Sequence, residues 1–72
     1  MEQLAKDLQD FLKAFNGCTV ETTPSALHVY PAKDVATPLF AELIFEFAFI
    51  NSLLYYIGVS IQGHLRFVLF RQ

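Results

Sequence analysis

Residues 51–70 read NSLLYYIGVSIQGHLRFVLF, and this stretch decides the fold. From Leu53 onward, apolar side chains recur at every second position, which is the period of a β-strand. The alternation continues to Ile61, stops at Gln62-Gly63 and resumes until Phe70. Two alternating segments around a glycine turn are typical of a hairpin, so we expect one over residues 53–70.

The turn of this hairpin follows from the side chains that its two strands must bury together. A two-residue turn at Gln62-Gly63 would pair Val59 with Arg66 and mix an apolar face with a charged one. A loop with an odd number of residues, such as 61–63 with a left-handed glycine, pairs Val59 with Leu65 instead. We therefore expect the odd loop and a positive φ at its glycine. The same parity gives two further pairs, Ile57 with Phe67 and Tyr55 with Leu69.

Upstream of this hairpin, residues 37–50 predict a helix that ends at Asn51-Ser52. Thr37 is suited to cap the helix start, and the proline after it is favoured in a first turn. The side chains expected to face the core are Leu39, Leu43, Phe47 and Ile50, with Phe40 and Ile44 beside them. The opposite side is expected to carry Phe45 and Phe49 next to the polar stripe of Glu42 and Glu46.

Another helix is expected over residues 2–15. It would end at Asn16-Gly17, because these two residue types tolerate the left-handed conformation that terminates helices. One stripe of this helix is apolar and is expected to face the core. The members of the stripe are Leu4, Ala5, Leu8, Phe11, Leu12 and Phe15.

Residues 18–30 predict the remaining hairpin, with its turn around Pro24. Antiparallel partners share one face of the sheet, so the apolar residues match if Val20 lies opposite Leu27 and Cys18 opposite Val29. This pairing requires an even number of loop residues. The residues that it turns to the other face are Thr19, Glu21, Ala26, His28 and Tyr30.

These elements make one α+β domain over residues 1–72, in the order α-β-β-α-β-β. We expect a four-stranded antiparallel sheet with two helices packed on one face, because each element has an apolar side to bury. The sheet residues expected beneath the helices are Val20, Leu27, Ile57, Val59, Leu65 and Phe67. A chain of 72 residues holds one core of modest stability, which a disulfide, a metal or a partner subunit usually supplements.

The polar residues form no catalytic pattern, and we expect neither an enzyme nor a cofactor or metal site. Glu42 and Glu46 have a spacing that suits a shared ligand, but no further acidic pair or Glu-x-x-His motif completes a metal site. We interpret them as a solvated stripe. Cys18 and His28 resemble a thiol with its base, yet parity places them on opposite faces. Cys18 is therefore interpreted as a buried hydrophobe, and His28, like His64, as a surface residue.

Charge and patterning also bear on partners and compartment. A net charge of -2 and a pI near 5.5 give no attraction to a phosphate backbone, so nucleic acid is disfavoured as a partner. A single cysteine and an N-terminus without the features of a signal peptide favour the cytoplasm. Residues 39–61 are long enough to cross a bilayer, but Asn51-Ser52 interrupts them and strand alternation follows. Membrane association is therefore the disfavoured alternative.

The chain holds more apolar residues than one small core needs, since hydrophobic residues make up 54% of it and aromatic residues 15%. We expect a non-catalytic protein–protein interaction module that forms a homodimer, with another protein as a second partner. The candidate interface residues are Tyr30, Leu54, Tyr56, Val68 and Phe70 on the outer sheet face, and Phe45 and Phe49 on helix 37–50. The sheet face is favoured, because the two phenylalanines of the helix flank glutamates that must stay solvated. The alternative function is binding of a small apolar ligand between helix 37–50 and the sheet.

Overall fold

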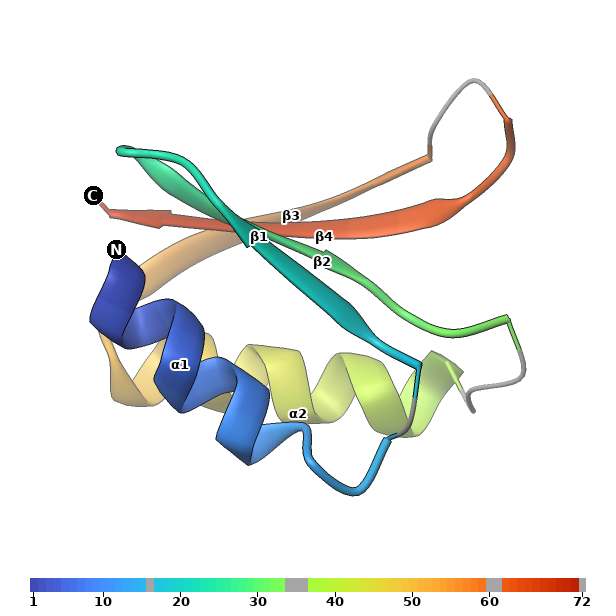
Figure 1. The fold of residues 1–72 in the computed structure, drawn as a ribbon, viewed down its shortest axis with the longest axis horizontal. Coiled ribbons are helices and arrows are strands. Elements are labelled where there is room, and N and C mark those ends of the chain that lie inside the picture. Colours follow the sequence, from blue (N-terminus) through green and yellow to red (C-terminus); the bar gives the residue numbers. More distant parts are fainter. Residues whose placement is uncertain (16, 34–36, 60–61, 72) are drawn as a thin grey trace.

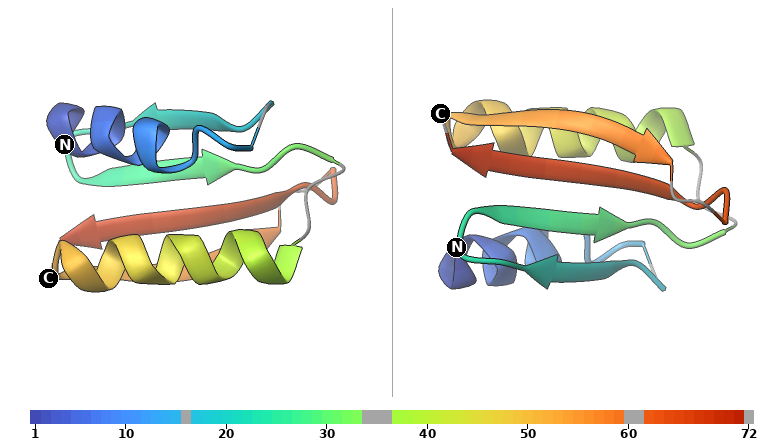
Figure 2. Two further views of the ribbon diagram at one scale, coloured as in Figure 1. Left: turned by 90° about the horizontal axis from the view of Figure 1, so that it is seen from below. Right: turned by 90° about the horizontal axis from the view of Figure 1, so that it is seen from above.

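The computed structural model describes residues 1–15, 17–33, 37–59 and 62–71. Its elements are α1 (Glu2–Phe11), β1 (Thr19–Thr22), β2 (Ala26–Tyr30), α2 (Thr37–Ile50), β3 (Leu53–Val59) and β4 (Leu65–Arg71). The strands form one antiparallel sheet in the order β1-β2-β4-β3. Both helices lie on the same side of this sheet (Figure 1), with α1 beneath β1 and β2 and α2 beneath β3 and β4 (Figure 2). The expected α+β class and element order are confirmed.

The centre of the sheet is the seam between β2 and β4, where the two hairpins meet. Leu27 lies opposite Leu69 and Val29 opposite Phe67, and all four side chains are fully buried. The helices cover this seam with further fully buried side chains, Leu8, Phe40 and Ile44. The core therefore lies between the helices and the two central strands, and the edge strands β1 and β3 flank it.

The hairpin of β3 and β4 has the expected register. Val59 pairs with Leu65, Ile57 with Phe67 and Tyr55 with Leu69, and Gly63 has a φ of +82°. The prediction of an odd loop is thus confirmed, because an odd number of residues separates the last paired positions. Residues 60 and 61 of that loop lie outside the described residues.

The hairpin of β1 and β2 keeps the predicted faces but shifts its register by two residues. Val20 lies opposite Val29, not Leu27. The cause is the Thr23 hydroxyl, which accepts hydrogen bonds from the backbone N–H groups of Ser25 and Ala26 at 3.4 and 3.1 Å. These bonds fix the turn at Pro24 and Ser25, one residue later than the predicted pairing implies.

Helix α1 ends at Phe11 and not at Phe15 as predicted. After Leu12 the backbone turns more tightly, since the Phe15 N–H donates to the Leu12 carbonyl, three residues back, at 2.8 Å. This turn brings Phe15 against Phe40, with ring centroids 5.4 Å apart in an edge-to-face contact. The predicted apolar stripe is confirmed: Ala5, Leu8 and Leu12 are buried, while Leu4, Phe11 and Phe15 pack against the core. The predicted helix terminator, Asn16-Gly17, therefore comes several residues after the observed end of α1. Gly17 has a positive φ of +85°, and residue 16 lies outside the described residues.

Helix α2 has the predicted bounds but presents a different face to the sheet. Its buried residues are Phe40, Ile44, Phe47 and Ala48, whereas Leu39 and Ile50 are exposed. The helix is apolar nearly all round, so periodicity alone does not fix its rotation. The observed face includes the small Ala48, which lets the helix backbone approach the sheet. At its end, the Asn51 side-chain amide donates to the Phe47 carbonyl at 2.9 Å, and Ser52 takes a φ of 55°, which confirms the predicted break.

The prediction that Ile57 and Val59 lie in the core is wrong. They occupy the helix side of the sheet, yet they expose 47% and 67% of their surface. The reason is their position on an edge strand. Strand β3 starts beside the end of α2, where Leu53 is buried, and then runs away from the helix toward its hairpin loop (Figure 1), so the helix covers Ile57 and Val59 much less.

We predict that Leu8→Ala destabilises the fold by about 2–5 kcal/mol, because it opens a cavity beneath the central seam. Leu39→Ala is the matched control on α2, where the side chain is 53% exposed, and it should change the free energy of unfolding by no more than about 0.5 kcal/mol. Urea unfolding at one fixed protein concentration measures both. An equal decrease in the free energy of unfolding for both variants would contradict the placement of Leu8 in the core.

A second prediction concerns the β3–β4 loop. Gly63→Ala should cost about 1–2 kcal/mol, because a side chain at positive φ is strained even though a Cβ there meets no atom within 4 Å. Gly58→Ala, at a strand position where the new Cβ makes an ordinary contact with Arg66, should be neutral or stabilising by about 0.4–1 kcal/mol. Thermal unfolding of both variants and the parent chain tests this: the melting temperature should fall for Gly63→Ala and should stay the same or rise for Gly58→Ala.

Candidate interaction surface

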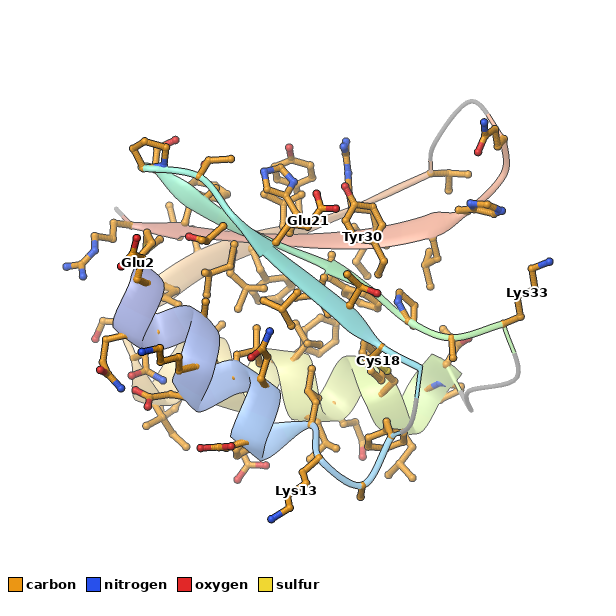
Figure 3. The ribbon with its side chains drawn as sticks, in the orientation of Figure 1. Glu2, Lys13, Cys18, Glu21, Tyr30 and Lys33 are labelled. Carbon is orange, nitrogen blue, oxygen red and sulfur yellow. The ribbon has the colours of Figure 1, made fainter. Side chains whose placement is uncertain are left out.

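The outer face of the sheet, on the side away from the helices, carries the residues predicted for it. Leu54 lies opposite Phe70, and Val68 lies between Tyr56 and His28 as a partner of both. Figure 3 shows Tyr30, with Glu21 near it, on this side of the sheet. The register therefore brings the five sheet residues of the candidate interface onto one face.

Much of this outer face is covered by its own side chains. Val68, at the centre, exposes only 3% of its surface. The ring of Tyr56 lies beside that of Phe70, with centroids 6.0 Å apart, and the two rings flank Val68. Tyr30 and Phe70 are half-buried, so Leu54 and Tyr56 are the residues of this set with the most apolar surface left for a partner.

A shallow depression of about 430 Å³ lies on the outer face above His28, Tyr56, Val68 and Phe70. The Nδ1 atom of His28 is buried without a hydrogen-bond partner. Cys18 lies on the opposite side, half-buried against the core, so the fold does not bring this thiol to the imidazole. The depression is thus lined by apolar side chains and one imidazole, with Thr23, Ser25 and Arg71 also around it, and it does not pair a thiol with a base.

Apolar exposure is concentrated on β3 and α2 instead. Large apolar residues that expose at least 44% of their surface in the described chain are Leu39, Phe49, Ile50, Leu54, Tyr55, Tyr56, Ile57 and Val59. The most exposed of them is Phe49, at 86%. No such residue is found on α1, β1, β2 or β4 within the described ranges.

Phe45 connects these two elements. Its ring stacks on that of Tyr55, with centroids 4.5 Å apart and planes inclined by 26°. Phe45 was predicted to lie on the bare side of its helix, but this contact makes it half-buried. Phe49 follows one helical turn later and lies about 40° further round α2, on its exposed side. We call Leu54, Tyr55, Tyr56, Ile57, Val59 and Phe49 together the β3 edge surface.

The polar residues singled out in the sequence do not gather into a site. Glu42 and Glu46 are exposed on α2, and His64 lies in the loop before β4. In the described residues no three His, Cys, Asp or Glu side chains come close enough to share a metal ion. Nor does any helix of the described chain have the length and apolar character needed to cross a membrane. Charged ends such as those of Lys13 and Lys33 project away from the sheet (Figure 3).

The space between α2 and the sheet, where the sequence suggested an apolar ligand, is occupied by side chains. Phe40, Ile44 and Phe67 have no exposed surface, and the rings of Phe40 and Phe67 are in contact there. A ligand in this place would have to displace these side chains.

Sequence reasoning missed Tyr55, Ile57 and Val59 as surface residues. Their alternation placed them correctly on the helix side of the sheet, but period two is the same in an edge strand and a central one. The signal that distinguishes them is strand order, which no local pattern in this chain encodes. The geometry therefore points to the β3 edge surface as the strongest candidate for interaction. Compared with known proteins, the chain matches no family model, no curated protein and no solved structure.

Proposed function

We propose that this protein is a non-catalytic protein–protein interaction module that forms a homodimer. The observation that carries the proposal is the exposure of large apolar side chains on two adjoining elements, α2 and β3. Soluble monomers rarely leave contiguous apolar patches of this kind in water, and such patches mark interaction sites. Covering them with a second copy removes apolar surface from water at a gain of roughly 25 cal/mol per Å².

The size of the chain supports self-association. A core of this size supplies only about 3–5 kcal/mol of stability on its own. Its single cysteine is free, so no internal disulfide adds to that margin. A partner subunit that binds only the folded chain would add stability in proportion to its concentration. We propose the cytoplasm as its compartment, where a free thiol such as Cys18 stays reduced.

The exposures favour the β3 edge surface over the centre of the outer face as the contact. Val68 is buried within the monomer and offers little area to a partner. Tyr56 and Leu54 belong to both surfaces, so they contribute in either arrangement. Phe49 has almost its whole side chain in water, so it is available to a partner. Glu42 and Glu46 on the same helix are also exposed, and the contact has to leave these carboxylates solvated.

Light scattering at micromolar concentration should report twice the chain mass of 8.2 kDa. Phe49→Ser should shift the protein toward monomer while its unfolding midpoint, measured at low concentration, stays within a few degrees of the parent chain. The reason is that an 86% exposed side chain makes few contacts within its own fold. Leu39→Ser, at an exposed leucine near the other end of α2, is the matched control and should remain dimeric.

Phe70→Glu probes the outer face separately. If Phe70→Glu dissociates the dimer while its far-ultraviolet circular dichroism stays that of the parent chain, and Phe49→Ser does not dissociate it, the contact lies on the outer face. A well-folded monomer for the parent chain at all accessible concentrations would rule out the homodimer.

A further inference from the structure

The two edges of the sheet differ in a way that bears on assembly. β1 has four residues, of which Thr19, Glu21 and Thr22 are polar and exposed, and it runs into Pro24. β3 has seven residues and no charged or proline residue among them. Natural edge strands are protected from pairing with other chains by short length, charge and proline. β1 has these protections and β3 has none of them.

We propose that two copies of this chain pair through their β3 strands, antiparallel about a two-fold axis, and so join two sheets into one of eight strands. This inference rests on the proposed homodimer and adds how the copies meet. In the described sheet β3 has β4 as its one neighbour, so half of its backbone N–H and C=O groups face outward. A second β3 supplies matching donors and acceptors to these groups along its whole length.

Symmetry restricts the register of this pairing. A two-fold axis perpendicular to the sheet keeps the helices of both copies on the same side, so paired residues must have the same orientation. Paired residue numbers must therefore differ by an even number, and one residue must lie opposite its own copy. The register that pairs all seven residues of β3 places Tyr56 opposite Tyr56 of the second copy.

Side chains are complementary in this register. On the helix side, Tyr55 lies opposite Ile57 of the second copy, an aromatic residue against a β-branched one, which stabilises antiparallel pairs. On the outer face, Leu54 lies opposite Gly58, whose missing side chain leaves room for it. The Arg66 guanidinium lies over Gly58, since a Cβ built there would sit 3.8 Å from the Nη2 atom. Its aliphatic portion would then pack on the incoming leucine.

The apolar area of this contact is modest. The five large apolar residues that β3 exposes have between 44% and 67% of their surface in water. With about 150–250 Å² in a fully exposed aromatic side chain and less in an aliphatic one, they offer on the order of 450 Å² per copy. Specific interfaces bury about 800 Å² per partner, so the backbone hydrogen bonds along β3 carry a larger share of this contact. On the helix side of β3, Ile57 and Val59 expose 47% and 67% of their surface, so this part of the strand is open to a second copy.

Cysteine cross-linking tests the arrangement directly. In a Cys18→Ala background, single substitutions Leu54→Cys, Tyr55→Cys, Tyr56→Cys, Ile57→Cys and Gly58→Cys are oxidised with glutathione disulfide at micromolar protein concentration. Opposed residues in an antiparallel pair have Cα atoms about 4.5–5.5 Å apart, within the range of a disulfide. Tyr56→Cys should form covalent dimer at least tenfold faster than Glu21→Cys, an exposed outer-face position on β1 that serves as the control.

Backbone amide hydrogen exchange, measured on the unmodified chain, is a second test that does not depend on whether a variant folds. Outward-facing amides within residues 53–59 should exchange at least tenfold more slowly at concentrations that give dimer than at concentrations that give monomer. The exchange of residues 19–22 should not change. Together, fastest cross-linking at Tyr56 and this local protection support the proposal.

Other outcomes overturn it, and they separate it from the proposed function. Fastest cross-linking at Tyr55 or Ile57 would refute the register centred on Tyr56. A dimer mass in light scattering with no cross-link along β3 and no protection of residues 53–59 would refute the edge pairing and leave the homodimer standing. Protection of residues 53–59 by added extended peptides, with the chain itself monomeric, would show that a foreign strand occupies the edge and would refute both.

Discussion

The antiparallel pairing of β2 with β4 is the contact on which the rest of the structure depends. Each half of the chain, a helix followed by a hairpin, has an apolar side that it cannot bury alone. Leu27 meets Leu69, which lies 42 residues later in the chain, and only this seam closes the core over both halves. A contact between residues so distant in the chain carries a large loop-closure cost, which the burial of both apolar sides offsets.

Some of this architecture could be read from the sequence, because a buried face leaves one choice of parity. The odd loop before β4 and the positive φ of Gly63 are of this kind. The bounds of α2 followed instead from Thr37-Pro38 at its start and Asn51-Ser52 after its end. What the sequence could not provide depends on contacts that periodicity does not encode. The Thr23 hydroxyl set the turn of the first hairpin, and Ala48 together with Phe40 selected the face of a helix that is apolar nearly all round.

For the candidate surface, too, periodicity predicted which face a residue lies on but not how exposed it is. The residues of the outer face could be assigned from alternation, but their exposure could not, because Val68 is shielded by Tyr56 and Phe70. Ile57 and Val59 were assigned to the correct side of the sheet, but they were predicted to be buried and are exposed. Both differences come from strand order. Placing β4 beside β2 moves β3 to the edge, where one apolar face meets a helix only in part and the backbone keeps an open side.

The polar edge of β1 decides how large an assembly of this chain can become. An eight-stranded sheet joined at β3 ends on both sides in β1, whose exposed glutamate and threonines and following proline offer a poor template for a further strand. A filament requires two edges that pair on every subunit, and the proposed pairing uses one. The proposed assembly would therefore close at two chains, so a higher protein concentration would populate dimers and would not start a fibre.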